Sequence, residues 1–134
     1  MILVDTNVLL DVFTDDPKWA DWSQHQLEAA SLSDRLAVNG VIYAELSTRY
    51  ARIEDLDAAL ESAGVTLVEI PREGLFLADK AFLVYRKGGG TRTGVLPDFF
   101  IGAHAAAANV PLLTRDPRRY RTYFPTAELI APEE

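Results

Sequence analysis

The chain has 134 residues, of which 49% are hydrophobic and 25% charged, and its formal net charge is −7. This length and composition predict a single domain, residues 1–134, that buries about two-thirds of the surface of its unfolded chain. The absence of cysteine excludes a disulfide framework, a thiolate zinc site and a cysteine nucleophile. The negative charge argues against a protein that binds nucleic acid simply through its overall charge.

The apolar segments are too short for a membrane protein. The longest apolar runs fall far below the roughly 20 residues that a transmembrane helix needs. The first residues, MILVDTNVLL, lack a basic region and reach an acid at Asp5, so we do not expect a signal peptide. We therefore expect a cytoplasmic protein with no membrane role, and the lack of cysteine fits a reducing cytosol.

Short apolar strands alternate with helical patterns along the N-terminal half. The predicted elements are a strand at 2–4, a helix at 7–13, a roughly helical segment at 18–31, a strand at 36–38 and a helix at 41–52. The turn Asn39-Gly40 separates the second strand from the helix that follows it.

The same alternation continues through the C-terminal half. The predicted elements are a helix at 55–63, a strand at 66–70, a helix at 73–87, a glycine loop at 88–90, a helix from 95, a strand at 111–114 and a short edge strand at 128–130. The helix at 73–87 places Leu75, Ala78, Phe82 and Tyr85 on one stripe. Strands that alternate with helices predict an α/β fold, with a parallel sheet of four to five strands flanked by helices on both faces.

Four acidic residues lie where this fold would bring them together. Ligands of open parallel sheets bind outside the carboxyl ends of the strands. Asp5 directly follows the first strand, and Asp116 follows the fourth strand. Glu45 lies early in the helix that leaves the second strand, and Asp98 lies in the first turn of the helix that precedes the fourth strand. We expect all four side chains at one edge of the sheet.

Each acid also has a local explanation. Asp5 would suit an Asx turn, and Asp116 precedes a proline, which is typical of a turn. Glu45 precedes Arg49 by four residues, the spacing of an ion pair on a helix surface. Asp98 would complement the positive end of a helix. The conjunction of the four acids, not any one of them, indicates a functional site.

Clustered carboxylates have a specific chemistry. Two unit charges about 4 Å apart repel by about 4 kcal/mol at an effective dielectric of about 20, so such a cluster must stay partly protonated or hold cations. A ligand set made only of oxygen selects hard ions such as Mg²⁺, Mn²⁺ or Ca²⁺. Mg²⁺ with few carboxylates, water and a substrate phosphate is the arrangement of metal-assisted phosphodiester hydrolysis.

The charge is distributed unevenly along the chain. Residues 1–84 hold 15 acids and 6 bases, whereas residues 85–134 hold 5 acids and 7 bases. The seven bases are Arg86, Lys87, Arg92, Arg115, Arg118, Arg119 and Arg121. This asymmetry is typical either of a solvated face or of a surface for an anionic partner.

Three runs carry a resemblance to a known family: ILVDTNVLL, VIYAEL and LPDFFIGAHAAAANVPLLTRDPRRY. In their order and spacing they resemble the PIN domain, most closely the VapC-type toxins of bacterial and archaeal toxin–antitoxin pairs, over nearly the whole chain. The resemblance implies an acidic quartet that binds the metal and is catalytic: Asp5, Glu45, Asp98 and Asp116. It also implies polar side chains that support this quartet: Thr6, Asn7 and Thr114.

The resemblance further implies a Mg²⁺- or Mn²⁺-dependent endoribonuclease toxin that cuts RNA by attack of metal-activated water. It implies a cognate antitoxin as partner, and a homodimer. Two divalent ions would change the net charge from −7 to about −3, which would allow basic side chains to contact RNA phosphates beside the metals. Arg115 is the first candidate for this contact, followed by Arg86 and Arg92. The alternative for Arg115 is a salt bridge that restrains the acid cluster.

Three other functions use the same fold class. A non-catalytic PIN scaffold would bind RNA or protein without cutting, but such a scaffold has no reason to keep four clustered acids. A phosphotransfer receiver domain needs an adjacent acid pair early in the chain and a lysine at the last strand, and here no lysine follows Lys87. A flavodoxin-like cofactor binder needs a phosphate-binding loop after the first strand, which this chain lacks.

The remaining distinctive side chains predict packing. His104 points away from the acids on its helix, and His25 stands among polar residues, so neither is expected to act as a general base. Phe13, Trp19 and Trp22 are expected in the core. The alternative is that some of them form an exposed apolar groove for the antitoxin, since large aromatic side chains suit an interface.

Overall fold

The computed structural model describes residues 1–133. Within them lies one five-stranded sheet, whose strands are β1 (Ile2–Val4), β2 (Leu36–Val38), β3 (Val65–Leu67), β4 (Leu112–Leu113) and β5 (Leu129–Ile130). Their order across the sheet is β3-β2-β1-β4-β5, and every neighbouring pair is parallel. The predicted parallel sheet is confirmed, with β1 at its centre.

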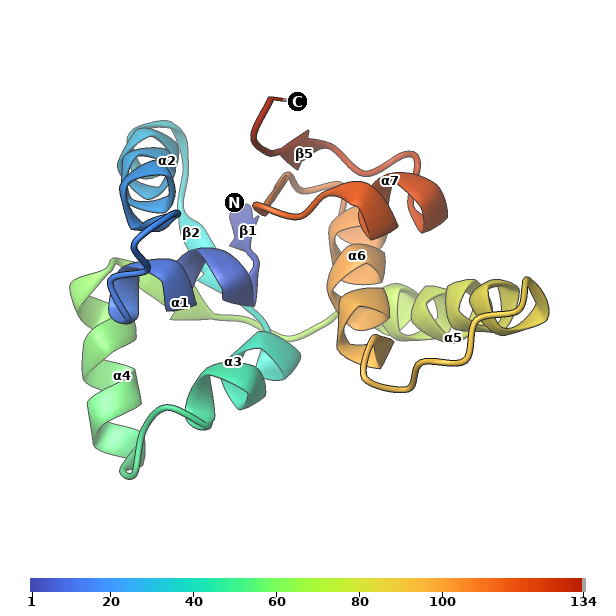
Figure 1. Ribbon diagram of the computed structural model, residues 1–134, viewed down its shortest axis with the longest axis horizontal. Helices are drawn as coiled ribbons and strands as arrows, with labels where there is room; N and C mark the ends of the chain where they lie inside the picture. Colours follow the sequence, from blue (N-terminus) through green and yellow to red (C-terminus); the bar gives the residue numbers. More distant parts are fainter. Residues whose placement is uncertain (134) are drawn as a thin grey trace.

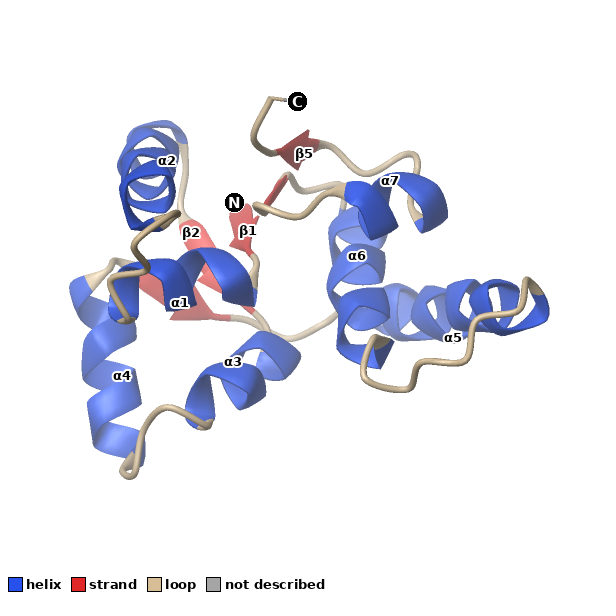
Figure 2. Ribbon diagram, in the orientation of Figure 1, coloured by secondary structure: helices blue, strands red, loops and turns tan. Residues whose placement is uncertain are grey.

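Seven helices in the described residues surround this sheet. They are α1 (Thr6–Phe13), α2 (Ala20–Ser33), α3 (Gly40–Ser47), α4 (Ile53–Ser62), α5 (Arg72–Lys87), α6 (Leu96–Ala108) and α7 (Arg118–Tyr123). α1 to α4 lie on one side of the strands and α6 and α7 on the other, while α5 packs against α6 and extends away from the sheet (Figure 1), so that the strands lie between two groups of helices (Figure 2). The predicted α/β fold is therefore confirmed. Across residues 1–133, none of the helices combines the length and the hydropathy that crossing a bilayer requires.

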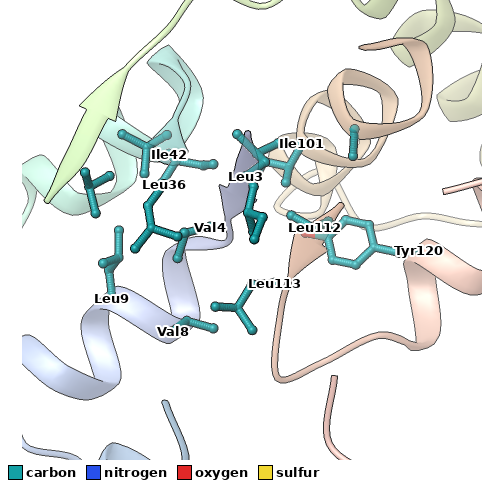
Figure 3. Packing of buried hydrophobic residues seen from close by; sticks show 14 of the residues in the cluster. Leu3, Val4, Val8, Leu9, Leu36, Ile42, Ile101, Leu112, Leu113 and Tyr120 are labelled. Atoms are coloured by element: carbon teal, nitrogen blue, oxygen red, sulfur yellow. The ribbon is translucent and has the colours of Figure 1, made fainter. Parts of the chain in front are cut away.

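The core forms on both faces of the central strands. Leu3 and Val4 of β1 are fully buried, and so are Leu112 and Leu113 of β4. Side chains from α1 and α3 pack on one side of these strands and Ile101 of α6 on the other (Figure 3). Strands buried on both faces need continuous apolar runs, which is why short segments such as ILV suffice for β1.

Two predicted boundaries were wrong. The helix predicted at 41–52 ends at Ser47, where the hydroxyls of Ser47 and Thr48 donate to the carbonyl oxygens of Tyr43 and Glu45. Such side-chain bonds compete with the continuation of a helix. The strand predicted at 66–70 occupies only Val65–Leu67.

The buried stripe predicted for residues 73–87 was partly wrong. Leu75 is 47% exposed, whereas Ala78 and Ala81 are buried. A Cβ on Gly74 would lie 3.3 Å from the Cα of His104 in α6. Phe82 and Tyr85 are partly buried and pack against Phe99 of α6, so Leu75 is the member of the stripe that lies outside. Near Gly74, small residues allow α5 to approach α6 closely, which hydrophobic periodicity does not reveal.

Candidate active site

The edge at the carboxyl ends of β1 and β4 is the topological switch point of the sheet. From β1 the chain proceeds to β2 on one side, and from β3 it returns to β4 on the other. The backbone N–H of Asp5 donates to the carbonyl of Leu113 at 2.9 Å, which ties the ends of the two strands together. Open α/β sheets bind their ligands at this point, and the sequence places Asp5 and Thr114 directly after the two strands.

Asp5 is 4% exposed and accepts several hydrogen bonds from uncharged donors. Its Oδ1 accepts from the backbone N–H of Thr6 at 2.7 Å, so the side chain also caps α1. Its Oδ2 accepts from Thr114 Oγ1 at 2.8 Å and from the hydroxyl of Tyr120 at 2.9 Å. Asn7 Nδ2 lies 3.4 Å from the same oxygen. Thr6, Asn7 and Thr114 thus all contact Asp5; their role in supporting a metal site stays a prediction.

Burial raises the pKa of Asp5 from 3.8 to about 6, since the carboxylate leaves water for a protein interior. The hydrogen bonds from Thr114 and Tyr120 oppose this rise, because they stabilise the charged form. The negative charge of Asp98 adds to it. The charge on Asp5 is therefore well oriented but not neutralised.

Glu45 of α3 joins Asp5 through a shared neighbour. Thr6 donates its backbone N–H to Asp5 and its hydroxyl to Glu45 Oε1, the latter at 2.6 Å. Asn39 caps α3 by accepting from the N–H of Ile42 at 3.0 Å, which fixes where this helix starts. Burial raises the pKa of Glu45, and the charge of Asp98 raises it further. The carboxylate of Glu45 therefore accepts a hydrogen bond from Thr6, instead of forming the helix-surface ion pair with Arg49 that its spacing allowed.

Asp98 lies in the first turn of α6 and contacts a cation. Arg119 Nη1 lies 2.5 Å from Asp98 Oδ2, and the two side chains are 28% and 32% exposed. Burial raises the pKa of Asp98, although the guanidinium of Arg119 opposes the rise. The charge of Asp116 raises it as well, which places Asp116 within electrostatic reach of Asp98.

Asp116 is the outermost of the four acids. Its side chain is 59% exposed and lies 3.7 Å from the Nε of Arg118, which is 85% exposed. Its backbone N–H donates to Thr114 Oγ1 at 3.1 Å, and this hydroxyl in turn donates to Asp5. Thr114 therefore links the innermost and outermost acids.

The structure brings the four predicted acids to one edge, but not into a finished metal site. Burial, followed by the charges of Asp5, Asp98 and Glu45, raises the pKa of Tyr120 well above its usual value, so these three acids surround one hydroxyl. Within residues 1–133, no three acidic or histidine side chains lie close enough to hold an ion as they stand. The donor set nevertheless fits a hard divalent cation, because it consists of carboxylate oxygens, and two of these acids, Asp5 and Glu45, accept hydrogen bonds from uncharged donors.

Two residues of α7 belong to the site and were not singled out from the sequence. Arg119 contacts Asp98, and Tyr120 contacts Asp5. Their helix was not predicted, because RRYRTY shows no clear apolar stripe. A Cβ on Gly102 would overlap the rings of Phe124 and Tyr120, so the glycine allows α6 to approach this segment closely enough to bring Tyr120 inside. The signal available in the sequence was an arginine and a tyrosine directly after the motif that carries Asp116.

Arg115 forms a salt bridge with an acid outside the quartet. Its Nε lies 2.8 Å from Asp11 Oδ2, and Asp11 is nearly fully buried. Ser23 donates to the same carboxylate at 2.8 Å, and the guanidinium lies 5.6 Å from the centre of the Trp19 ring. Arg115 therefore does form a salt bridge, but its partner is Asp11 and not a member of the acid cluster that the alternative named. An acid within the apolar helix NVLLDVF was the signal for it.

The other singled-out side chains are placed as follows. His104 is buried and lies with its Nδ1 3.1 Å from Asn39 Nδ2, which confirms a role in packing. His25 is exposed. Trp19 packs edge-on against Trp22, and Phe13 contacts the core while staying partly exposed. Arg86 and Arg92 are exposed, at the end of α5 and in the loop after it.

Comparison with solved structures shows a shared fold over the whole chain. VapBC2 from Rickettsia felis, bound to a DNA fragment from its promoter, is 18% identical with a TM-score of 0.74, over 99% of this chain and 100% of that chain. VapBC-1 from nontypeable Haemophilus influenzae is 20% identical with a TM-score of 0.70, over 98% of each chain. A DNA-bound VapBC from Salmonella typhimurium is 15% identical with a TM-score of 0.71, over 97% of this chain and 96% of that chain.

No protein of curated function matches this chain. A family model does match, and it covers residues 2–125, which include the whole sheet edge with its four acids up to α7. The match, the parallel sheet and the structural neighbours agree with one another, and the chain belongs to the PIN domain family.

Proposed function

We propose that this protein is a metal-dependent endoribonuclease and the toxin of a toxin–antitoxin pair, acting on RNA in the cytoplasm. One observation carries the proposal. Acids from four separate elements meet at the switch point of the sheet, and the pKa values of three of them, Asp5, Glu45 and Asp98, are raised by burial. Unrelieved negative charge in a partly buried site is what a divalent cation would relieve.

The quartet would hold Mg²⁺ or Mn²⁺, which would activate a water and neutralise charge on the scissile phosphate and the leaving oxygen. The chain's own contribution is orientation. Thr6 holds Asp5 and Glu45 together, while Thr114 and Tyr120 fix the other oxygen of Asp5. Hydrogen bonds of this kind, donated to a metal ligand by residues that do not themselves bind the metal, set the geometry of the ligand. Because the donors are uncharged, they leave the negative charge available to the cation.

An antitoxin partner is supported by the solved neighbours, which are toxin–antitoxin complexes from Rickettsia felis, Klebsiella pneumoniae and other bacteria. A groove of about 440 Å³ between α1, α2 and α4 could accept part of such a partner. Its apolar lining includes Val12, Phe13 and Leu27. Exposed apolar side chains on α5, among them Phe76 and Val84, support a homodimer.

The decisive experiment is RNA cleavage by purified protein with Mn²⁺, Mg²⁺ or a chelator. We expect Asp5→Asn and Asp98→Asn to reduce cleavage by at least about 100-fold, and the chelator to abolish it. Asp79→Asn removes the same charge from an exposed acid on α5 and should cleave like wild type. Circular dichroism verifies the fold of each variant. Wild-type rates in both site variants would show the assignment to be wrong.

The second candidate is a non-catalytic PIN scaffold that binds RNA or protein. It is favoured by one observation, that within residues 1–133 no three acidic side chains are positioned to hold an ion together. This candidate predicts RNA binding that is unaffected by Mn²⁺ and no cleavage at any metal concentration. Calorimetric titration with Mn²⁺ beside the cleavage assay distinguishes the two.

A further inference from the structure

We propose that Arg119 serves as a counter-cation of the acidic quartet. In the metal-free protein its guanidinium pairs with the carboxylate of Asp98. A divalent ion that binds this carboxylate would displace the guanidinium, which would then contact the RNA phosphate. This inference rests on the proposed nuclease function and adds a residue and a coupling to it. It starts from the contact of 2.5 Å between Arg119 Nη1 and Asp98 Oδ2.

Asp98 is the acid at which a cation acts on the whole site. Tyr120, the residue next to Arg119, donates to Asp5. Thr6 links Asp5 to Glu45, and Thr114 links Asp5 to the backbone of Asp116, so the other three acids lie at the same edge of the sheet as the Arg119–Asp98 pair. A guanidinium on Asp98 therefore relieves repulsion with each of the other three acids. A divalent ion bound there would do the same with twice the charge.

Two other arginines that follow β4, Arg115 and Arg118, are engaged elsewhere. Arg115 donates to both carboxylate oxygens of the buried Asp11, at 3.1 and 2.8 Å. Arg118 is 85% exposed and lies 3.7 Å from the exposed Asp116, which is a weak surface pair. Arg119 is the one of these three that contacts an inner acid.

The neighbouring residue anchors α7 while Arg119 keeps freedom to move. Tyr120 is buried, donates to Asp5 and packs against Gly102 of α6. Its anchoring fixes the backbone of Arg119 beside the quartet. The side chain of Arg119 is 28% exposed at its contact with Asp98, and an arginine has several rotatable bonds, so the guanidinium can leave Asp98 without unfolding α7.

A guanidinium and a divalent ion on the same carboxylate compete, because both are cations that bind the same oxygens. Displaced from Asp98, the guanidinium stays at the sheet edge beside the proposed metal site. Arginine forms paired hydrogen bonds with phosphate oxygens. Arg119 should therefore affect the affinities for metal and for RNA in opposite directions. Without Arg119, the protein should bind metal more tightly and RNA more weakly. A residue that merely supports the fold would weaken both or neither.

The test is calorimetric titration of metal-free protein with Mn²⁺, in the absence of RNA. We expect Arg119→Gln to bind Mn²⁺ about fivefold more tightly than wild type, the effect of removing a partly exposed charged contact. Arg119→Lys, which keeps the charge, should show less than about half of this gain in binding free energy. Arg35→Gln is the matched control: it removes one positive charge from an exposed residue just before β2, at the opposite edge of the sheet, and should bind like wild type.

A double variant ties the effect to the pair. In an Asp98→Asn background, Arg119→Gln should produce no gain in Mn²⁺ affinity, because the carboxylate for which the cations compete is absent. At saturating Mn²⁺, cleavage by Arg119→Gln should show a KM for RNA raised by about tenfold, and raised more than kcat is lowered.

The outcomes distinguish failure of the counter-cation role of Arg119 from failure of the proposed nuclease function. Equal or weaker Mn²⁺ binding by Arg119→Gln and Arg119→Lys, in a wild type that binds Mn²⁺ and cleaves RNA, overturns the counter-cation role and leaves the nuclease assignment intact. An unchanged KM for RNA overturns the phosphate contact. A wild type that neither binds Mn²⁺ nor cleaves RNA refutes the proposed function, and the counter-cation role with it.

Discussion

The acids near β1 and the acids near β4 have different hydrogen-bond and ion-pair partners. On the β1 side, Asp5 and Glu45 accept hydrogen bonds from the uncharged donors Thr6, Thr114 and Tyr120. On the β4 side, Asp98 and Asp116 lie against arginines. Uncharged donors orient a carboxylate but leave its charge in place, whereas arginines compensate it. The carboxylates on the β1 side are therefore oriented but keep their charge, whereas those on the β4 side each have an arginine beside them.

A fifth acid, Asp11, is fully compensated. Asp11, one and a half helical turns after Asp5 on the same chain segment, is buried with Arg115 and Ser23 on its carboxylate. No oxygen of this acid is left for a metal without breaking the pair. Burial alone thus does not distinguish Asp11 from Asp5; the kind of donor does.

Breaking the buried Asp11–Arg115 salt bridge should have the largest effect on stability. Arg115→Ala leaves the buried Asp11 without its cation, and we expect the free energy of unfolding to fall by about 3 kcal/mol. Arg118→Ala, which removes an exposed arginine at 3.7 Å from Asp116, should change it by less than about 0.5 kcal/mol. Urea unfolding of both variants checks this, and equal losses would contradict the distinction.

Neutralising the uncompensated acid should do the opposite. Asp5→Asn should raise the stability of the metal-free protein by about 2 kcal/mol at pH 7, because a rise of the pKa from 3.8 to about 6 corresponds to about 3 kcal/mol and the amide is a poorer acceptor. Well below pH 3.8 Asp5 is protonated in both the folded and the unfolded chain, so this advantage vanishes. It grows as pH rises through 4 to 6, since the unfolded chain loses the proton first.

Thermal unfolding at pH 4, 5, 6 and 7 in the presence of a chelator measures this gap. Asp79→Asn on α5 is the control, because it removes the same charge from a carboxylate that is 67% exposed. A gap between Asp5→Asn and wild type that stays constant with pH, or a variant less stable at pH 7, would contradict the interpretation of Asp5 as an uncompensated charge.

Removing one uncharged donor should have the smallest effect. Tyr120→Phe deletes the hydrogen bond to Asp5 Oδ2 while keeping the buried ring, and we expect a loss of about 1 kcal/mol in stability at pH 7. The pKa of Asp5 should rise further, because this bond opposes the effect of burial. In an Asp5→Asn background the loss should shrink. An undiminished loss there would mean that the hydroxyl serves packing alone.

Much of the fold followed from local patterns. The triplets ILV and LAV were predicted within the bounds of β1 and β2, because strands covered on both faces must be apolar throughout. The convergence of Asp5, Glu45, Asp98 and Asp116 on one edge also followed, since parallel strands point their carboxyl ends the same way. Their identity as metal ligands stays a prediction.

What the sequence by itself determined is which acids reach the edge of the sheet: connectivity and strand direction decide this, and both are written in short-range patterns. Only the tertiary structure decided how each acid is compensated. The pairs Asp98–Arg119 and Asp11–Arg115 and the contact of Tyr120 with Asp5 join residues 21 to 115 positions apart. They depend on how closely helices pack, as at Gly102, and no local pattern encodes that distance.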